Sequence, residues 1–127
     1  QTGCAAALKG SKRDMDAILF AALSPLFASR AYPVKLPEGA EYPACTYQYI
    51  GNTEEPFVDA GQLIERLRVQ LNIYTEEYDQ CSALRAQVID SLRGLNEFME
   101  QNFDSNGYEP DTQLFTWLID MSFRYQP

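Results

Sequence analysis

The sequence predicts an α+β domain, with a mostly antiparallel sheet of four to five strands and two helices packed on one face. Apolar and polar residues alternate through Leu67–Ile73, the period-2 pattern of a strand with one buried face. Between Cys81 and Leu95 the apolar spacing changes to three and four residues, as in a core-facing helix. A second long alternation covers residues 113–125. Strands joined by short connections favour an antiparallel sheet with the helices on one side.

The first predicted element is a helix over about residues 16–29, capped by Asp14 or Asp16. Its apolar residues form two adjacent rows, one of Ile18, Ala22 and Leu26 and one of Leu19, Leu23 and Phe27. Pro25 lacks an amide hydrogen. We therefore expect a kink or an early end of the helix at that point.

Extended chain is expected next, because the prolines of Tyr32-Pro33 and Leu36-Pro37 favour the edge of a sheet. A strand follows over residues 44–50, with Cys45, Tyr47 and Tyr49 on one face. Residues 51–62 are rich in glycine, proline and acidic side chains and are predicted as a protruding arm or a disordered loop. The central strand then covers residues 63–74.

The second helix opens at residues 75–77, where acidic side chains favour the positive end of the helix dipole, and Gly94 favours its end. Residues 100–111 are predicted as turns, with a tight turn at Asn106-Gly107. The last strand, residues 113–125, has an aromatic and aliphatic face that includes Phe115 and Trp117. Its other face becomes polar from Asp120 onward.

Length and composition indicate one folded domain. The chain has 127 residues, of which 46% are hydrophobic and 22% charged, which is ordinary for a folded protein. No apolar run approaches the roughly 18 residues of a membrane span, so no membrane partner is expected. We expect residues 1–14 to be a flexible arm or a remnant ahead of a native start near Met15, and residues 15–127 to form the single domain.

The charge distribution argues against a DNA-gripping protein. The formal net charge is −8; Lys9, Lys12 and Arg13 against Asp14 make the first 14 residues about +2, which leaves −10 on the rest. Binding to phosphate backbones depends on lysine and arginine. Two interpretations of the acidity remain: it lets DNA slide past without sticking, or it only keeps the protein soluble.

The residues show no pattern typical of catalysis. Glycine-rich nucleotide loops, nucleophile elbows and zinc-protease motifs are absent from the sequence. The neighbouring pairs Glu54-Glu55 and Glu76-Glu77 cannot converge on one bond in a strand or a helix. Lys35 is a lone lysine and favours a surface charge. The sequence therefore predicts no enzyme, no catalytic residue and no cofactor.

The three cysteines form no paired motif, and the chain has no histidine, so no zinc site is expected. Buried free thiols explain Cys45 and Cys81 and fit a reducing cytoplasm. The aromatic residues Tyr47, Tyr49, Phe115 and Trp117 raise the idea of a stacking platform for nucleic acid. Such platforms need basic grooves, so packing in a core or a subunit interface is the favoured interpretation.

Several short motifs carry a family resemblance: Tyr32-Pro33, Leu36-Pro37, YPACTY at residues 42–47, and RLRVQLNIYTEEYDQCSALRAQVIDSLRG at residues 66–94. Together they resemble the tail completion or tail terminator family of tailed phages. The resemblance implies a structural virion protein, assembled in the host bacterial cytoplasm. It would form a ring, expected to be hexameric, that caps the tail tube, stops its growth and joins it to the head connector.

The implied partners follow from that role. They are further copies of the chain, which would be monomeric before assembly, the tail tube protein and the head–tail connector protein; DNA would only pass through the lumen. We expect the arm residues Glu54, Glu55, Phe57 and Asp59 to contact a neighbouring subunit or the tube, with Phe57 as the apolar anchor. Arg66 and Arg68 are expected to pair with such acids across subunits, or equally within the sheet.

Two other classes of protein remain open at this point. One is a head–tail connector or other neck protein, which would form a ring at a different joint. The other is a cytoplasmic domain that binds a small molecule in a carboxylate-lined pocket.

Overall fold

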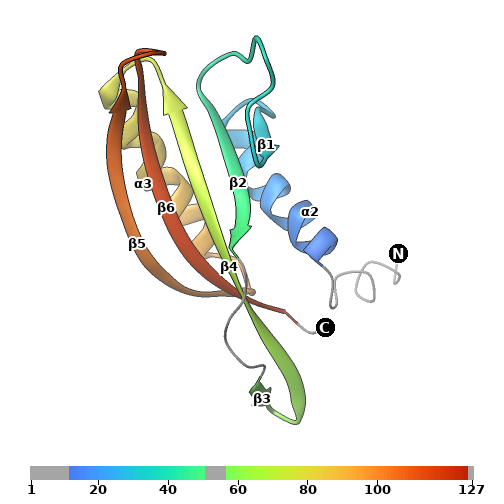
Figure 1. The fold of residues 1–127 in the computed structure, drawn as a ribbon. Coiled ribbons are helices and arrows are strands. Elements are labelled where there is room, and N and C mark those ends of the chain that lie inside the picture. Colours follow the sequence, from blue (N-terminus) through green and yellow to red (C-terminus); the bar gives the residue numbers. More distant parts are fainter. Residues whose placement is uncertain (1–11, 51–56, 126–127) are drawn as a thin grey trace.

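A computed structural model describes residues 12–50 and 57–125 of the chain. Figure 1 shows a twisted sheet with two helices, and its elements follow one another in this order: α2 (Lys12–Leu23), the 3-10 turn η1 (Ser24–Leu26), β1 (Ala31–Pro33), β2 (Ala44–Ile50), β3 (Phe57–Asp59), β4 (Gln62–Thr75), α3 (Tyr78–Arg93), β5 (Phe98–Glu109) and β6 (Leu114–Tyr125).

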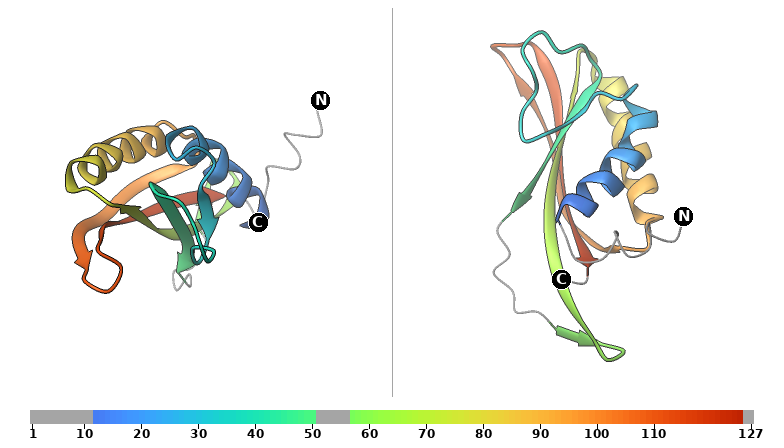
Figure 2. Two further views of the ribbon diagram at one scale, coloured as in Figure 1. Left: turned by 90° about the horizontal axis from the view of Figure 1, so that it is seen from above. Right: turned by 90° about the vertical axis from the view of Figure 1, so that its right-hand side faces the viewer.

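The strands form one sheet in the order β1-β2-β4-β6-β5, and β3 pairs with the beginning of β4 off this path. Only the β1–β2 pair is parallel; the β2–β4, β3–β4, β4–β6 and β5–β6 pairs are antiparallel. Both helices cover the same face of the sheet (Figure 2). The predicted α+β class, with a mostly antiparallel sheet and two helices on one face, is confirmed.

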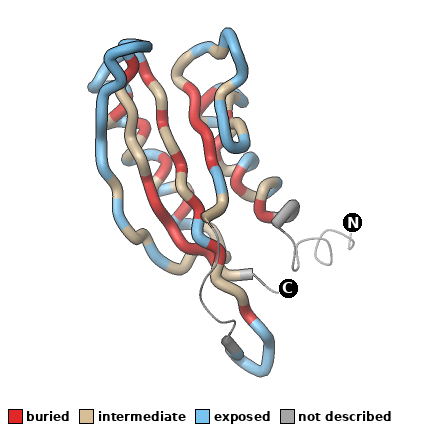
Figure 3. Tube along the Cα trace, in the orientation of Figure 1, coloured by how far each residue is buried: buried red, intermediate tan, exposed pale blue. Residues whose placement is uncertain are grey.

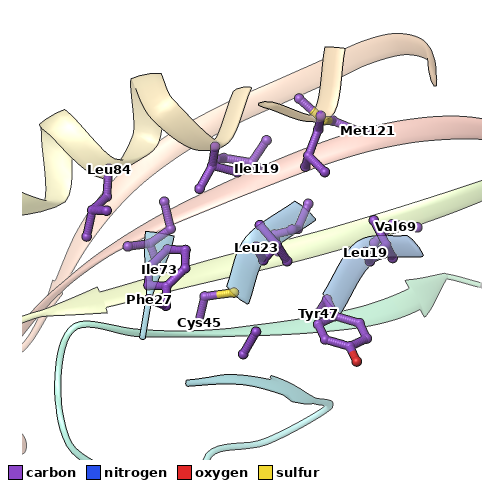
Figure 4. Packing of buried hydrophobic residues seen from close by; sticks show 14 of the residues in the cluster. Leu19, Leu23, Phe27, Cys45, Tyr47, Val69, Ile73, Leu84, Ile119 and Met121 are labelled. Atoms are coloured by element: carbon purple, nitrogen blue, oxygen red, sulfur yellow. The ribbon is translucent and has the colours of Figure 1, made fainter. Parts of the chain in front are cut away.

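The core lies between the helices and this face, as Figure 4 shows. Leu19, Leu23 and Phe27 come from the first helical segment, while Leu84 and Val88 come from α3. They pack against the alternating apolar residues of the two central strands: Leu67, Val69, Leu71 and Ile73 of β4 and Ile119, Met121 and Phe123 of β6. Because side chains alternate along a strand, the even-numbered residues of β4 and β6 face the side without helices.

The first helix differs in its bounds from the predicted 16–29. It begins at Lys12 and ends at Leu23, and a 3-10 turn with Pro25 in its first positions follows. Proline has no amide hydrogen to continue the hydrogen bonding of the α-helix. The early end of α2 therefore has the cause that was expected, namely Pro25. The predicted domain start at residue 15 lies inside α2, where Met15 is fully buried.

The turn prediction for residues 100–111 is wrong, because Phe98–Glu109 form β5. Asn106-Gly107 pair in register with Trp117 and Thr116, and the connection to β6 falls at residues 110–113 instead. Gly107 lies so close to β6 that a Cβ there would meet the Thr116 hydroxyl oxygen at 3.1 Å. A side chain at this position would therefore require the Thr116 side chain to shift.

The prediction for residues 51–62 is partly corrected. Phe57–Asp59 and Gln62 belong to strands, and Ala60-Gly61 form the turn between them. The segment 51–56 lies outside the described residues. The other predicted bounds hold closely: β1 with Pro33 is an edge strand, β2 matches residues 44–50, and α3 ends at Arg93 with Gly94 as its C-cap.

Candidate assembly surfaces

The most prominent surface is a hairpin that projects beyond the sheet. β4 pairs with β6 only from Glu65 onward and with β2 only from Arg68 onward. Its first residues, 62–64, therefore pair with β3 alone. Figures 1 and 2 show the resulting hairpin standing clear of the sheet. We call residues 57–64 the projecting hairpin.

A two-residue turn closes the projecting hairpin. Ala60 and Gly61 have φ values of 52° and 79°, the left-handed conformation at both central positions that fits the twist of paired strands. Beside the turn, Val58 lies directly opposite Leu63, and they are 69% and 52% exposed. An exposed apolar pair at the tip of a projecting element is typical of a contact surface for another molecule.

The predicted arm residues are only partly visible in this geometry. Phe57 pairs with Ile64, and Asp59 pairs with Gln62, in the backbone register of the projecting hairpin. Glu54 and Glu55 lie outside the described residues. Among the described side chains of the projecting hairpin, Val58 and Leu63 are large, apolar and exposed, and sequence reasoning missed both. The sequence shows no alternation there, since Leu63 and Ile64 are adjacent apolar residues; only the pairing of β3 with β4 places Val58 opposite Leu63.

The two predicted arginines pair within the sheet. Arg68 donates from Nε and Nη2 to the two carboxylate oxygens of Asp120, at 2.9 and 3.0 Å. Gln70 and Asn102 also donate to that carboxylate, at 3.1 and 2.7 Å. Arg66 donates to Glu100 at 2.6 Å and to the Ser122 hydroxyl at 3.2 Å. Of the two expectations for these arginines, pairing inside the sheet is the one seen in the single chain.

These residues form a polar network on the face of the sheet without helices. Asp120 and Ser122 are completely buried within it. Burial alone would raise the pKa of Asp120, but hydrogen bonds from Arg68, Asn102 and Gln70 outweigh it and hold the pKa below its usual range. Every buried polar side-chain atom among the described residues has a partner. The network thus ties β4, β5 and β6 together rather than presenting an unsatisfied group for chemistry.

A second cluster, which sequence reasoning missed, joins α3 to the β5–β6 end of the sheet. Asp104 accepts hydrogen bonds from Arg85 Nε and from the indole Nε1 of Trp117, both at 2.7 Å. The Arg85 guanidinium also lies over the Trp117 ring, 5.5 Å from its centroid. Arg85 is the main cause of a lowered pKa at Asp104. Since Asp104 belongs to the strand mistaken for a turn, its partners could not be foreseen.

The aromatic residues do not form an open platform. Tyr47 is buried, and Tyr49, Phe115 and Trp117 pack against the core on the helix side of the sheet. The Tyr49 hydroxyl donates to Asp16 of α2, and the ring of Tyr78 contacts Phe115 and Trp117. The stacking interpretation for nucleic acid therefore has no support in their placement, while the core interpretation does.

Within residues 12–50 and 57–125 no cluster of side chains has the composition of a metal site. In the same part of the chain, no helix is long and apolar enough to cross a membrane.

Comparison with known proteins places this fold. The model of the family described as tail completion protein gp17 matches residues 17–126. No curated protein matches the chain. Among solved structures, a chain of the "Virion of native gene transfer agent (GTA) particle" superposes with a TM-score of 0.55 over 88% of this chain and 87% of that chain. Their sequences are 13% identical, so this likeness shows a common fold alone.

Proposed function

The chain belongs to the tail completion protein gp17 family, and from this premise we propose that it caps the phage tail tube as a ring of identical subunits. The family makes it a structural protein of a phage tail. In the proposed role the ring binds the last layer of the tube, stops its elongation and presents its other surface to the head connector. No catalytic step is part of this function.

The projecting hairpin is the observation that carries the proposal. It is anchored in the long central strand and holds Val58 and Leu63 opposite each other in solvent, beyond the limits of the sheet. A capping protein must reach an acceptor surface on the tube while its own fold stays intact. We propose that the hairpin, including the predicted residues Phe57 and Asp59 and the preceding Glu54 and Glu55, makes this contact.

The charge of the chain supports the passage of DNA through such a ring. A net charge of −8 repels phosphate backbones at short range, so that DNA moves through without being held. The likeness to a chain of a gene transfer agent virion supports a place inside a phage-like particle.

The experiment that tests capping is tube growth with the purified tube protein. Polymerisation is followed by light scattering, and final lengths by electron microscopy, with and without the chain. We expect substoichiometric chain to stop elongation, because one ring blocks one tube end. Leu63→Asp places a charge on the exposed apolar pair and should abolish the effect. Ala86→Asp, on an exposed position of α3, is the matched control and should cap normally.

A head–tail connector role is the alternative that the same experiment separates. If tubes reach full length in the presence of the chain, while the chain binds the isolated connector protein, the protein belongs to a different joint. For the small-molecule alternative, a pocket at the β5–β6 connection is lined by two carboxylates, Glu109 and Asp111, but all of its lining residues come from the single segment 108–112 rather than from separate elements.

A further inference from the structure

After Asp16, the exposed surface of the first helical segment carries no charged side chain. Residues 17–29 contain no charged side chain, and Ala17, Phe20 and Ala21 are exposed, Phe20 to 40%. A helix on a protein surface normally carries polar residues on its outer face, and one that is apolar all round is normally buried. This part of the helix is therefore a candidate contact surface for another molecule.

Phe20 points to the side of the molecule rather than toward α3. Ile18 and Ala22 line the groove between α2 and α3, and Phe20, two residues from each, lies about 200° around the helix from them. Asp16, one turn before Phe20, bonds to Tyr49 of β2. Phe20 thus lies at the edge of the molecule formed by β1 and β2, where Val34 is also exposed to 66%. We call this surface the α2–β1 edge.

The opposite edge of the sheet is also incomplete. β5 is its terminal strand, and Figure 3 shows most of its length as exposed. Phe103 of β5, opposite Asp120 on the face without helices, is 45% exposed, and Tyr108, opposite Phe115 on the helix face, is 50% exposed. Figure 1 shows β5 and the α2–β1 edge on opposite sides of the molecule. A single chain therefore carries two different apolar surfaces that cannot contact each other.

The two edges differ in formal charge. Residues 94–113, around β5, contain five acidic and no basic side chains. Glu100 and Asp104 are paired with Arg66 and Arg85, which leaves Glu97, Glu109 and Asp111 as the acidic groups of this edge.

Residues 15–35, which include the α2–β1 edge, contain two basic side chains, Arg30 and Lys35, and one acidic one, Asp16, although the whole protein is acidic. When two surfaces of opposite charge meet, their attraction speeds association. Two copies of the same edge would instead bring like charges together, which disfavours that contact. Formal charge therefore favours contact between the two different edges of identical chains over contact between like edges.

We propose that the α2–β1 edge of one copy packs against β5 of the next, with Phe20 beside Phe103, and that this contact repeats around the ring. The inference rests on the proposed function, which supplies the ring. Such a contact is heterologous, because two different surfaces meet. A heterologous contact closes into a ring when the rotation that relates neighbouring copies returns to the first copy. The projecting hairpin stays outside this contact and remains available to the tube.

Cross-linking of singly substituted chains tests the arrangement. In a Cys4→Ser background the remaining natural thiols, Cys45 and Cys81, are buried. Ala17→Cys lies one turn from Phe20, and Ser105→Cys lies two residues from Phe103 on β5; both positions are exposed. The two variants are mixed, assembled with tube protein and treated with a short bismaleimide. We expect Ala17→Cys to link to Ser105→Cys, and neither variant alone to form linked dimers.

The outcomes separate this inference from the proposed function. Rings that form and cap tubes, but give linked dimers from either variant alone or no mixed dimers, would overturn the edge-to-edge contact and leave capping intact. If the unsubstituted chain neither forms rings nor caps tubes, the proposed function fails and this inference with it. Mixed dimers in rings that cap tubes support both.

A pair of charge substitutions gives a second measurement. Phe20→Asp should weaken ring assembly at least about tenfold, the loss expected for one buried aromatic anchor of an interface. Ala86→Asp introduces the same charge on α3 and should leave assembly unchanged. Circular dichroism of the monomers shows whether each variant is folded. A folded Phe20→Asp chain that assembles like the unsubstituted one would contradict the contact.

Discussion

Arg68 and Asp120 form a two-point ion pair on the face of the sheet that carries no helix, with Nε and Nη2 lying 2.9 and 3.0 Å from the two carboxylate oxygens. The carboxylate is completely buried, while the arginine side chain is 44% exposed. Asp120 therefore depends on the ion pair to keep its charge stable, because its carboxylate has no access to water. Asp120→Asn should lower the free energy of unfolding by about 2 kcal/mol, the scale of hydrogen bonds to a charged group, measured by urea denaturation.

The same pair makes stability depend on pH. The pKa of Asp120 is lower in the folded protein than in the unfolded chain, so its contribution is fully present above the ordinary aspartate pKa of about 4. The contribution is lost as the pH falls through the lowered value. Urea midpoints measured at decreasing pH should fall less steeply for Asp120→Asn than for the unsubstituted protein. Parallel curves would contradict this role of Asp120.

Trp117 reports directly on the ionisation of Asp104. It is the single tryptophan of the chain, and its indole donates to the carboxylate that Arg85 also binds. Arg85 is the largest cause of the lowered pKa of Asp104, so Arg85→Gln should raise the acid midpoint of Trp117 fluorescence. Arg93→Gln removes an arginine that stacks on Phe98 instead and should leave the midpoint in place. An unchanged midpoint in Arg85→Gln would refute the coupling.

Replacing a buried and an exposed leucine by alanine distinguishes a residue needed for folding from one that is free to serve assembly. Leu23 is fully buried and Leu63 is 52% exposed. Leu23→Ala should cost about 2–5 kcal/mol of unfolding free energy through lost contacts and a cavity, whereas Leu63→Ala should stay within about 0.5 kcal/mol. Thermal denaturation measures both. A large loss for Leu63→Ala would mean that the projecting hairpin is part of the core.

Two glycines give a matched test of the hairpin turn. Gly61 has a φ of 79° with nothing near its missing Cβ, so only backbone strain opposes a side chain there. Gly61→Ala should favour opening of the hairpin by about 1 kcal/mol, seen as faster amide exchange in β3 and residues 62–64. Gly94 has an ordinary φ of −78°, and Gly94→Ala should not change exchange in the hairpin.

The sequence predicts most of the fold because its main strands have one apolar and one polar face. The alternation through Leu67–Ile73 and Phe115–Phe123 is visible without knowing the neighbouring strands. β5 lacks that signal: it is an edge strand, exposed along much of its length, and register shifts after Phe98 and Gln101 interrupt its pairing. Asn106-Gly107 then suggests a turn, although in the structure both residues lie within β5 and pair with Trp117 and Thr116.

The candidate surfaces were less predictable than the fold. Arg66 and Arg68 could be placed on the polar face of their strand, and Asp120 and Ser122 on that of theirs. Which arginine meets which acid depends on the β4–β6 register, where Arg68 lies opposite Ser122 and Gln70 opposite Asp120. Register comes from tertiary packing rather than from either strand alone. The exposed Val58–Leu63 pair likewise required the hairpin pairing.

The most direct test of capping is to locate the chain on growing tubes. Tubes assembled from the purified tube protein are mixed with gold-labelled chain, supplied with more tube protein and imaged by electron microscopy. We expect label at one end of each tube and no further growth from that end. Label spread along the tubes, or labelled ends that continue to elongate, would contradict it.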